Sequence, residues 1–255
     1  MKIKILIPVY NDWQSVFKLV DEIDSLSISS EYELSIVIVN DASNHDRDET
    51  VKEYNNLKSV KILNMKINQG HARCIATGLK YINEKEDFDY VIPMDGDGED
   101  RPEEILQFIE NINTSNNKPI VGERVKRSES LLFQICYKIH KLITLVFTGH
   151  TIKYGNFTCL PKDTVEKMTK EKATWNSFSG ALKKIEKDLI KVPSVRGSRY
   201  FGPSKMSFKN LITHSLSIIS VFRKTVLFRS ALFIVFYILL IKSNASIITL
   251  IPFVL

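Results

Sequence analysis

The chain has 255 residues, 44% of them hydrophobic and 25% charged, which is enough apolar material for one large domain or for one domain with an appendage. Its three cysteines, Cys74, Cys136 and Cys159, are far apart and form no CxxC pair, which argues against a disulfide scaffold or a zinc site. The formal charge of +6 hides an asymmetry: residues 1–110 hold 12 Lys and Arg against 22 Asp and Glu, whereas residues 111–255 hold 23 against 7. Such a basic half is typical of proteins that bind nucleic acid, anionic lipid or a phosphorylated substrate.

Apolar strands and amphipathic helices alternate through the first hundred residues. The patterns predict strands over residues 3–10, 32–43, 60–65 and 89–95, and helices over residues 13–26, 48–57 and 69–84. Near-continuous apolar strands that alternate with helices predict an α/β fold with a Rossmann-like, mostly parallel, doubly wound sheet. Ligands of such sheets collect at the carboxyl ends of the strands. The polar turns "PVYND", "VNDAS" and "MDGDGED" all fall at such ends.

The second half becomes progressively more apolar. A helix is predicted over 102–112, a strand with a basic turn over 119–127, and an apolar amphipathic helix over 131–147, before a mixed region over 155–200. Residues 207–224 have helical periodicity and flanking bases, which suits a helix in a membrane interface. From 230 to 255 the only charge is Lys242, and the run "VLFRSALFIVFYILLI" is slightly short of the roughly 20 residues that span a bilayer. We expect a transmembrane helix or hairpin whose second arm is short or truncated; a buried C-terminal helix is the alternative.

The turn after the predicted strand at 89–95 carries unusual negative charge. Asp95 and Asp97 stand two residues apart, so in an extended segment both side chains point to the same side. Two carboxylates so close together favour a cation between them, and hard oxygen ligands suit Mg²⁺ or Mn²⁺. A solvated acidic turn is the alternative, although the position at a strand's carboxyl end favours a metal site.

Several segments together carry a family resemblance. "ILIPVYND", "IVIVNDAS", "NQGHARCIATGL", "MDGDGEDRPEEI" and "VGERVKR", in this order and spacing, closely resemble the family 2 inverting glycosyltransferases of the GT-A fold. The nearest branch is that of dolichol-phosphate mannosyltransferase and the bacterial polyprenyl-phosphate glycosyltransferases. The resemblance covers roughly residues 3–205 and implies three parts: a GT-A domain over 1–206, an amphipathic juxtamembrane helix over 207–225, and transmembrane segments over 226–255.

The resemblance also implies roles for individual residues. It places Asp95, Asp97 and Glu99 around the metal, although Glu99 stands where the branch usually has Gln. A nucleotide pocket is implied at Pro8, Tyr10, Asn11, Asp41, Gly70 and Asp95. Turn formation and packing are the alternative reasons for Pro8 and Tyr10.

Basic positions of the branch are matched in the second half. The resemblance implies that Asp97 works together with four cations that meet the acceptor phosphate or the donor pyrophosphate, namely Arg124, Arg127, Arg199 and Lys205. Guanidinium groups suit phosphate oxygens bidentately, and Lys adds a point charge. A solvated basic face or contact with anionic lipid is the alternative. Asn156 replaces an Asp of the branch, so that position offers no general base.

The implied activity is transfer of a sugar from a UDP- or GDP-sugar to a membrane polyprenyl phosphate, with inversion and with Mg²⁺ or Mn²⁺. The catalytic domain is then expected on the cytoplasmic side of the membrane, and a homo-oligomer is compatible with the resemblance. A sugar hydroxyl on a lipid-linked glycan is the first alternative acceptor, and an inactive nucleotide-binding scaffold is the second alternative. Nucleic acid is not expected as a partner, because the basic half ends in an apolar segment and contains no recognised motif.

Overall fold

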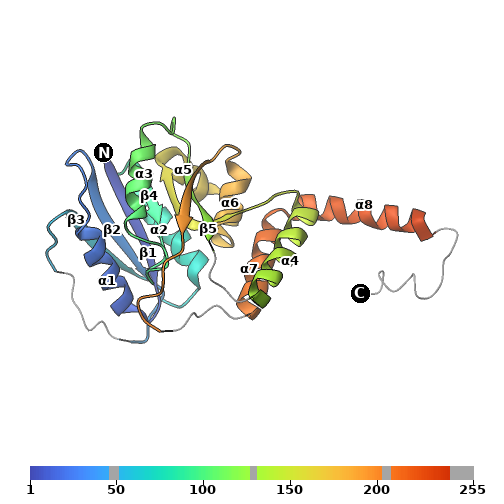
Figure 1. Ribbon diagram of the computed structural model, residues 1–255, viewed down its shortest axis with the longest axis horizontal. Helices are drawn as coiled ribbons and strands as arrows, with labels where there is room; N and C mark the ends of the chain where they lie inside the picture. Colours follow the sequence, from blue (N-terminus) through green and yellow to red (C-terminus); the bar gives the residue numbers. More distant parts are fainter. Residues whose placement is uncertain (46–51, 127–130, 203–207, 242–255) are drawn as a thin grey trace.

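The computed structural model describes residues 1–45, 52–126, 131–202 and 208–241. Its centre is a seven-stranded sheet of order β3-β2-β1-β4-β6-β5-β7 (Figure 1). The strands are β1 (Lys2–Val9), β2 (Glu33–Asn40), β3 (Leu57–Asn64), β4 (Tyr90–Pro93), β5 (Ile120–Lys126), β6 (Tyr154–Pro161) and β7 (Ile190–Val195). β6 pairs antiparallel with β4 and β5, whereas every other pair of neighbouring strands is parallel. The carboxyl ends of six strands therefore lie at the same edge as the start of β6.

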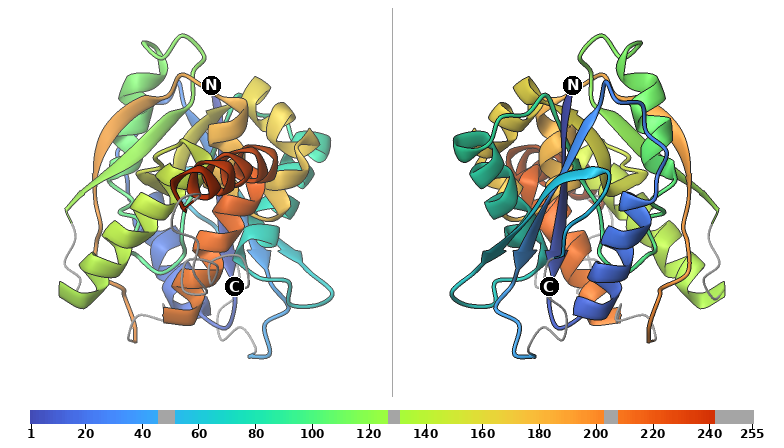
Figure 2. Two further views of the ribbon diagram at one scale, coloured as in Figure 1. Left: turned by 90° about the vertical axis from the view of Figure 1, so that its right-hand side faces the viewer. Right: turned by 90° about the vertical axis from the view of Figure 1, so that its left-hand side faces the viewer.

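Helices cover both faces of the sheet (Figure 2). α1 (Trp13–Asp24) and α3 (Glu104–Ile112) pack on one face, while the other face is covered by α2 (His71–Lys85), α5 (Lys162–Lys170) and α6 (Phe178–Ile185). A short 3-10 helix, η1 (Lys172–Trp175), joins α5 to α6. The apolar strands produce this arrangement because their side chains point alternately to the two faces. In β1, Ile5 and Ile7 enter the core beneath α1, whereas Leu6 enters the core beneath α2.

Three further helices lie beside the sheet domain. α4 (Leu131–Thr148) and α7 (Phe208–Val221) lie side by side, and α8 (Arg223–Ile241) extends away from the rest of the molecule (Figure 1). By length and composition α8 could cross a membrane, and none of its residues is buried within the protein. It is the one helix of this kind in the described part of the chain.

Most of the predicted elements are present, and one is wrong. The mostly parallel α/β sheet is confirmed, but the mixed region at 155–200 contributes the antiparallel strand β6 and the edge strand β7. The predicted helix at 48–57 is wrong where the structure describes it, because residues 52–56 are irregular and Leu57 already begins β3. The predicted second arm of the membrane hairpin falls within residues 242–255, outside the described residues.

Candidate active site

The acidic turn, residues 95–100, follows β4 directly at the carboxyl edge of the sheet. Its backbone is folded by its own carboxylates. Asp100 is buried and accepts a hydrogen bond from the Asp95 N–H at 2.9 Å, and Asp97 accepts one from the Glu99 N–H at 3.0 Å. Gly98, with φ of +87°, allows the chain to reverse between them. The turn therefore holds its carboxylates in fixed positions.

The strap, residues 196–200 after β7, lies against the acidic turn. The Gly197 N–H donates to the Glu99 carbonyl at 2.8 Å, and the Tyr200 N–H donates to the Asp97 carbonyl at 2.9 Å. Two arginines of the strap neutralise the turn. Arg196 pairs with Glu99, and Arg199 pairs with Asp97. The Arg199 guanidinium also reaches Oδ2 of Asp12, just before α1, at 2.9 Å.

Asp95 is held differently from Asp97. Its Oδ1 is buried and accepts no hydrogen bond within the described residues. His71, the first residue of α2, places Nε2 3.3 Å from this oxygen and 2.7 Å from Nδ2 of Asn156 on β6. A protonated Nε2 can donate to Asp95, whereas an unprotonated Nε2 can accept from Asn156. The imidazole thus connects the acidic turn with the position where the branch usually has Asp.

Opposing influences act on the two carboxyl groups. Burial alone would raise the pKa of Asp95, but His71, Arg124 and Arg196 outweigh it and lower that pKa below its ordinary value. Burial, and then the charge of Asp95, raise the pKa of Asp97 in spite of Arg199. A further cation would stabilise both ionised carboxylates, because like charges this close disfavour double ionisation.

The first of the residues expected at the nucleotide lie at the end of β1 and just after it. Pro8 is buried in β1, whereas Tyr10 is 42% exposed. Asn11, with φ of +54°, accepts hydrogen bonds from the backbone N–H groups of Asn44 at 2.8 Å and of His45 at 3.2 Å. It therefore fixes the turn that follows β2 against the end of β1.

Asp41 and Gly70 meet at the start of α2. The two Asp41 carboxylate oxygens accept from the backbone N–H groups of Gln69 and Gly70 at 2.7 and 2.8 Å. Gly70 has φ of +89° and ψ of 162°, a conformation that is essentially restricted to glycine. A Cβ there would meet no atom within 4 Å, so open space adjoins this turn. Asp41 thus shapes a backbone turn that is accessible from outside.

Of the four expected cationic residues, Arg124 and Arg199 lie within the described residues. Arg124 lies near the end of β5, with its Nη2 3.2 Å from the position of a Cβ on Gly155, so its guanidinium lies against the start of β6. Its positive charge, after that of His71, is among the influences that lower the pKa of Asp95. Arg127 and Lys205 lie outside the described residues. The described structure therefore brings Asp95, Asp97, Glu99, Arg124 and Arg199 to one edge of the sheet.

The carboxylates of the acidic turn suit a hard divalent cation whose remaining coordination positions are filled by oxygens of a substrate. No group of three His, Cys, Asp or Glu side chains that could hold a metal occurs within the described residues. Mg²⁺ in phosphate-handling sites commonly takes only one or two protein carboxylates together with substrate phosphates. The buried Oδ1 of Asp95, which lies 3.3 Å from Nε2 of His71 and makes no hydrogen bond within the described residues, is an oxygen of the required type.

Sequence reasoning missed several residues of this site. Asp12, just before α1, caps no backbone N–H of that helix with its side chain and instead pairs with Arg199. Arg196 and His71 were not singled out. Arg196 stands three residues before the expected Arg199, and His71 directly follows the expected Gly70. Their positions next to expected site residues were the one signal in the sequence for Arg196 and His71. The residues that they contact are too distant in sequence to be recognised.

The mostly parallel sheet gathers carboxylates, arginines and an open glycine turn at its carboxyl edge, where α/β sheets commonly bind their ligands. These features define the class as an α/β protein whose carboxyl edge is the candidate ligand site. The chain belongs to glycosyl transferase family 2, whose family model matches residues 4–178. This assignment confirms the family resemblance on the greater part of the sheet domain.

Curated relatives agree at low identity. The undecaprenyl-phosphate 4-deoxy-4-formamido-L-arabinose transferase of Klebsiella pneumoniae is 23% identical over 225 residues, which are 83% of this chain and 64% of the relative. The protein of the same name from Photorhabdus laumondii is 27% identical over 227 residues, covering 83% of this chain and 65% of the relative. The chain thus spans just under two thirds of the length of these relatives.

Solved structures confirm the fold. Glucosyl-3-phosphoglycerate synthase from Mycobacterium tuberculosis, in complex with Mn²⁺, uridine diphosphate and glucosyl-3-phosphoglycerate, superposes with a TM-score of 0.62. It is 10% identical, and the match covers 88% of this chain and 79% of that chain. At this identity the likeness concerns the GT-A architecture alone.

Proposed function

We propose that this chain is a glycosyltransferase that moves a sugar from a UDP- or GDP-sugar to a membrane polyprenyl phosphate. Membership of glycosyl transferase family 2 supports the reaction class. The names of the relatives, which specify undecaprenyl phosphate, support the acceptor. The observation that carries the proposal is the juxtaposition of Asp95 and Asp97 with Arg124 and Arg199 at one edge of the sheet. Opposite charges arranged in this way suit a cation and a diphosphate between them.

The proposed reaction is a single displacement. An acceptor phosphate oxygen attacks the anomeric carbon, the bond from that carbon to the nucleoside diphosphate breaks, and its electron pair leaves with the diphosphate. This displacement inverts the anomeric centre. Mg²⁺ or Mn²⁺, when bound, neutralises the charge that develops on the leaving diphosphate. Asp95 and Asp97 would hold that cation, and Glu99, which pairs with Arg196 in the structure, is the third carboxylate that would be available to it.

The cations and polar turns of the edge orient the two substrates. Arg124 and Arg199, together with Arg127 and Lys205, bind phosphate oxygens of the donor and the acceptor. On the nucleotide side, contacts come from the ends of β1 and β2 and from the turn before α2, through Pro8, Tyr10, Asn11, Asp41 and Gly70. Asn156 is neutral, so it does not repel an anionic acceptor. A phosphate oxygen is already anionic near neutral pH and needs no general base.

For the membrane parts we propose the boundaries expected from the sequence. Residues 1–206 form the catalytic domain on the cytoplasmic side, residues 207–225 lie in the interface, and the span begins near 226. The exposed and apolar surface of α8 supports this placement. It brings the headgroup of a polyprenyl phosphate to the level of the sheet domain.

The test is product formation by the full chain in bilayer nanodiscs that contain undecaprenyl phosphate. A panel of UDP- and GDP-sugars, radiolabelled in the sugar, is supplied with Mg²⁺ or Mn²⁺, and the lipid phase is counted. We expect labelled lipid with one nucleotide series, and mild acid should release the sugar from its phosphodiester. Label in a lipid-linked glycan supplied in parallel would favour a hydroxyl acceptor. Nucleotide binding without turnover of any donor would favour the inactive scaffold.

A further inference from the structure

The position of Asn156 coincides with an irregularity in the pairing of β5 with β6. The register shifts between Val121 and Glu123, so that residues 155–157 of β6 lie opposite Gly122 alone. A bulge of this kind bends its strand and re-aims side chains, and bulges are over-represented next to active sites. The side chain of Asn156 accordingly reaches the start of α2 instead of a neighbouring strand.

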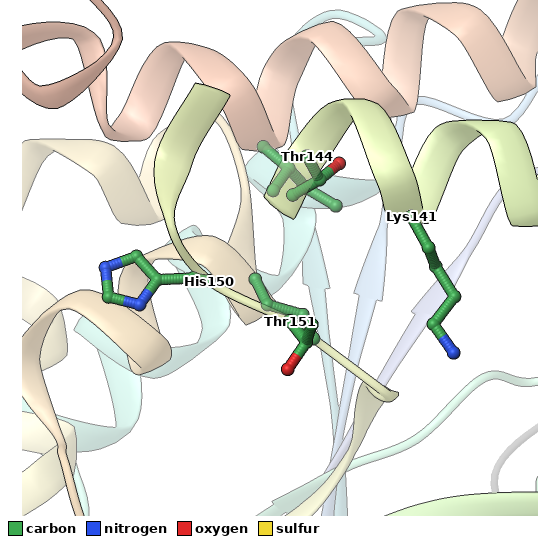
Figure 3. Close-up of a pocket in the computed structure, with 6 residues that line it drawn as sticks. Lys141, Thr144, His150 and Thr151 are labelled. Atoms are coloured by element: carbon green, nitrogen blue, oxygen red, sulfur yellow. The ribbon is translucent and has the colours of Figure 1, made fainter. Parts of the chain in front are cut away.

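The segment that leads into β6 is packed firmly in place. His150 and Thr151 share with α4 a cavity of about 10 Å³ (Figure 3). That volume accommodates about one water molecule, so the cavity is too small for a substrate. The His150 ring also packs on Phe222 at a centroid distance of 4.7 Å. The start of β6, and with it the bulge, is therefore held from the side of α4 and α7.

His71 meets the Asn156 amide from the first position of α2. Its Nε2 lies 2.7 Å from Nδ2 of Asn156 and 3.3 Å from Oδ1 of Asp95. An unprotonated Nε2 would bring a lone pair close to a carboxylate oxygen that has no hydrogen-bond partner within the described residues. A proton on Nε2 removes this repulsion, and a half-turn of the Asn156 amide then presents Oδ1 to accept that proton. In this arrangement the amide N–H groups point away from His71.

A cation lies close to the same amide. Arg124 places Nη2 3.2 Å from the position of a Cβ on Gly155, the residue before Asn156. Amide N–H groups near a guanidinium suit the oxygens of a phosphate, because each donates a hydrogen bond and the guanidinium adds charge. A carboxylate at position 156 would instead repel the phosphate and compete with it for Arg124.

We propose that Asn156 is a specificity-determining residue that donates to the phosphate of the acceptor, and that His71 holds its amide in the donating orientation. The inference rests on the proposed function, because it takes a polyprenyl phosphate as the acceptor. His71 is a positioning residue: its Nε2–H fixes the amide oxygen and leaves the amide N–H groups to the acceptor. The pair selects an anionic acceptor over a sugar hydroxyl, because Asn156 offers no base for the proton of a hydroxyl.

The orientation of the pair is tested by nitrogen-15 spectra of the histidine rings in the full chain, labelled with nitrogen-15 histidine and held in nanodiscs. The signals of His71 are identified by their loss in His71→Gln. We expect a proton on Nε2 of His71. A proton on Nδ1 alone would overturn the inference, because Asn156 would then donate to His71 and turn its oxygen toward the acceptor.

The role in recognition is tested by titrating geranyl phosphate, a short polyprenyl phosphate, into the full chain in nanodiscs. Geraniol, which lacks the phosphate, reports binding of the hydrocarbon alone. Asn156→Asp should weaken the binding of geranyl phosphate by about 10- to 100-fold and leave that of geraniol unchanged. Asn113→Asp, the same change at an exposed position after α3, is the control.

The positioning role is tested by a double-mutant cycle with the same probe. His71→Ala and Asn156→Ala should weaken geranyl phosphate to a similar extent, and the double variant should be no weaker than either. His71→Gln should restore most of the affinity, because its Nε2–H replaces that of the imidazole. Additive losses, or equal affinities of His71→Gln and His71→Ala, would overturn the role of His71.

The results separate this inference from the proposed function. If the wild type prefers geranyl phosphate to geraniol but Asn156→Asp behaves like Asn113→Asp, the inference is wrong and the proposed acceptor stands. If the wild type does not distinguish the two probes, the proposed acceptor fails and the inference fails with it. In the turnover assay Asn156→Asp should raise the KM for undecaprenyl phosphate and leave kcat and the KM for the donor nearly unchanged. A lower kcat at unchanged KM would contradict the assignment.

Discussion

Arg199 is the residue on which the charges of the candidate site converge. Its guanidinium lies between Asp97 and Asp12, and its side chain is only 13% exposed. Nε of the same group is buried without a hydrogen-bond partner in the described part of the chain. A cation in this position holds the acidic turn together in the way that a divalent metal would. Arg199 and the metal are therefore expected to compete for Asp97.

The substitution Arg199→Gln should make stability depend more strongly on the metal. Loss of the guanidinium leaves Asp97 and Asp12 uncompensated, which should cost about 1–3 kcal/mol of unfolding free energy. Saturating Mn²⁺ should then raise the unfolding temperature of the variant more than that of the wild type, because no internal cation competes. Arg101→Gln, at a more exposed pair with Glu103, is the control. An identical Mn²⁺ shift in wild type and Arg199→Gln would contradict the competition.

Asp97→Asn should remove most of the activity while preserving the fold. The amide keeps the shape of the side chain but loses the charge that holds the cation against the diphosphate. The loss of a comparable electrostatic group in other active sites lowers kcat by about 10²- to 10³-fold. Labelled product from the nanodisc assay measures this, and Asp188→Asn, an exposed carboxylate, is the control. Activity of Asp97→Asn close to that of the control would exclude Asp97 from the site.

At the scale of elements, a buried ion network joins β1, β3 and the end of α2. Glu86 accepts from Lys4 at 3.2 Å and from Lys61 at 2.6 Å, and the side chains of Lys4 and Glu86 are only 8% and 7% exposed. Burial alone would raise the pKa of the Glu86 carboxyl, but hydrogen bonds from Lys61 and Lys4 outweigh it and hold that pKa below its ordinary value. The network fixes the end of α2 opposite to the one that carries His71.

Glu86→Gln should destabilise the protein near neutral pH by about 3 kcal/mol, because it leaves Lys4 buried without a counter-charge. Because the pKa of Glu86 is lower in the folded state, its contribution is present above the pKa of the unfolded chain and is lost as pH falls through the folded pKa. The difference in unfolding temperature between wild type and variant should therefore shrink in acid. Glu84→Gln, at an exposed position of the same helix, is the control. A difference that is constant down to strongly acidic pH would refute the ionic explanation.

The fit between the acidic turn and the strap can be tested at Gly98. A Cβ there would lie 2.7 Å from the Tyr200 ring, which is held by a hydrogen bond to Glu22 and by Lys18 over its face at 4.5 Å. Gly98→Ala should therefore cost about 1–3 kcal/mol from this overlap, in addition to the strain of a positive φ. Gly70 also has a positive φ, but a Cβ there would enter open space. Gly70→Ala should therefore lower the unfolding free energy through backbone strain alone.

A double-mutant cycle isolates the overlap. In a Tyr200→Leu background the ring is absent, so the extra cost of Gly98→Ala should largely disappear, whereas the cost of Gly70→Ala should not change. Thermal unfolding of the four combinations gives the coupling. If Gly98→Ala lowers the unfolding free energy by the same amount with and without the Tyr200 ring, the ring does not crowd Gly98 in solution.

At the scale of the whole molecule, the sheet order explains the charge asymmetry. The acidic half supplies β1 to β4 and the acidic turn, while the basic half supplies β5, β7 and the strap. In the sheet, β6 lies between β4 and β5. The fold therefore brings basic segments of the second half close to the acidic turn of the first half, although acidic and basic residues are separated along the sequence. Some of the remaining basic residues lie on α4, α7 and α8, where an anionic membrane surface would attract them, and others lie on α5 and α6.

The sequence was sufficient for the parts of this arrangement that depend on local pattern. The strand before the acidic turn, the helix that opens at Gly70 and the apolar helix after Arg223 all appear where periodicity and glycine placed them. The antiparallel direction of β6 could not be predicted, because it is set by pairing with β4 and β5, which are distant in sequence, and not by the side-chain pattern of the strand itself. The pairing of Arg199 with Asp12 could not be predicted either, because 187 residues separate them and only the folded sheet brings them together.

The central claim is that the acidic turn binds a divalent cation together with a nucleoside diphosphate. Isothermal titration of UDP and of GDP into the full chain, with Mn²⁺ and then with EDTA, tests it most directly. We predict that one of the two nucleotides binds with Mn²⁺, that its binding weakens at least tenfold in EDTA, and that Asp95→Asn removes the dependence on metal. Equal affinity with and without Mn²⁺, or no binding of either nucleotide by a folded protein, would contradict the account.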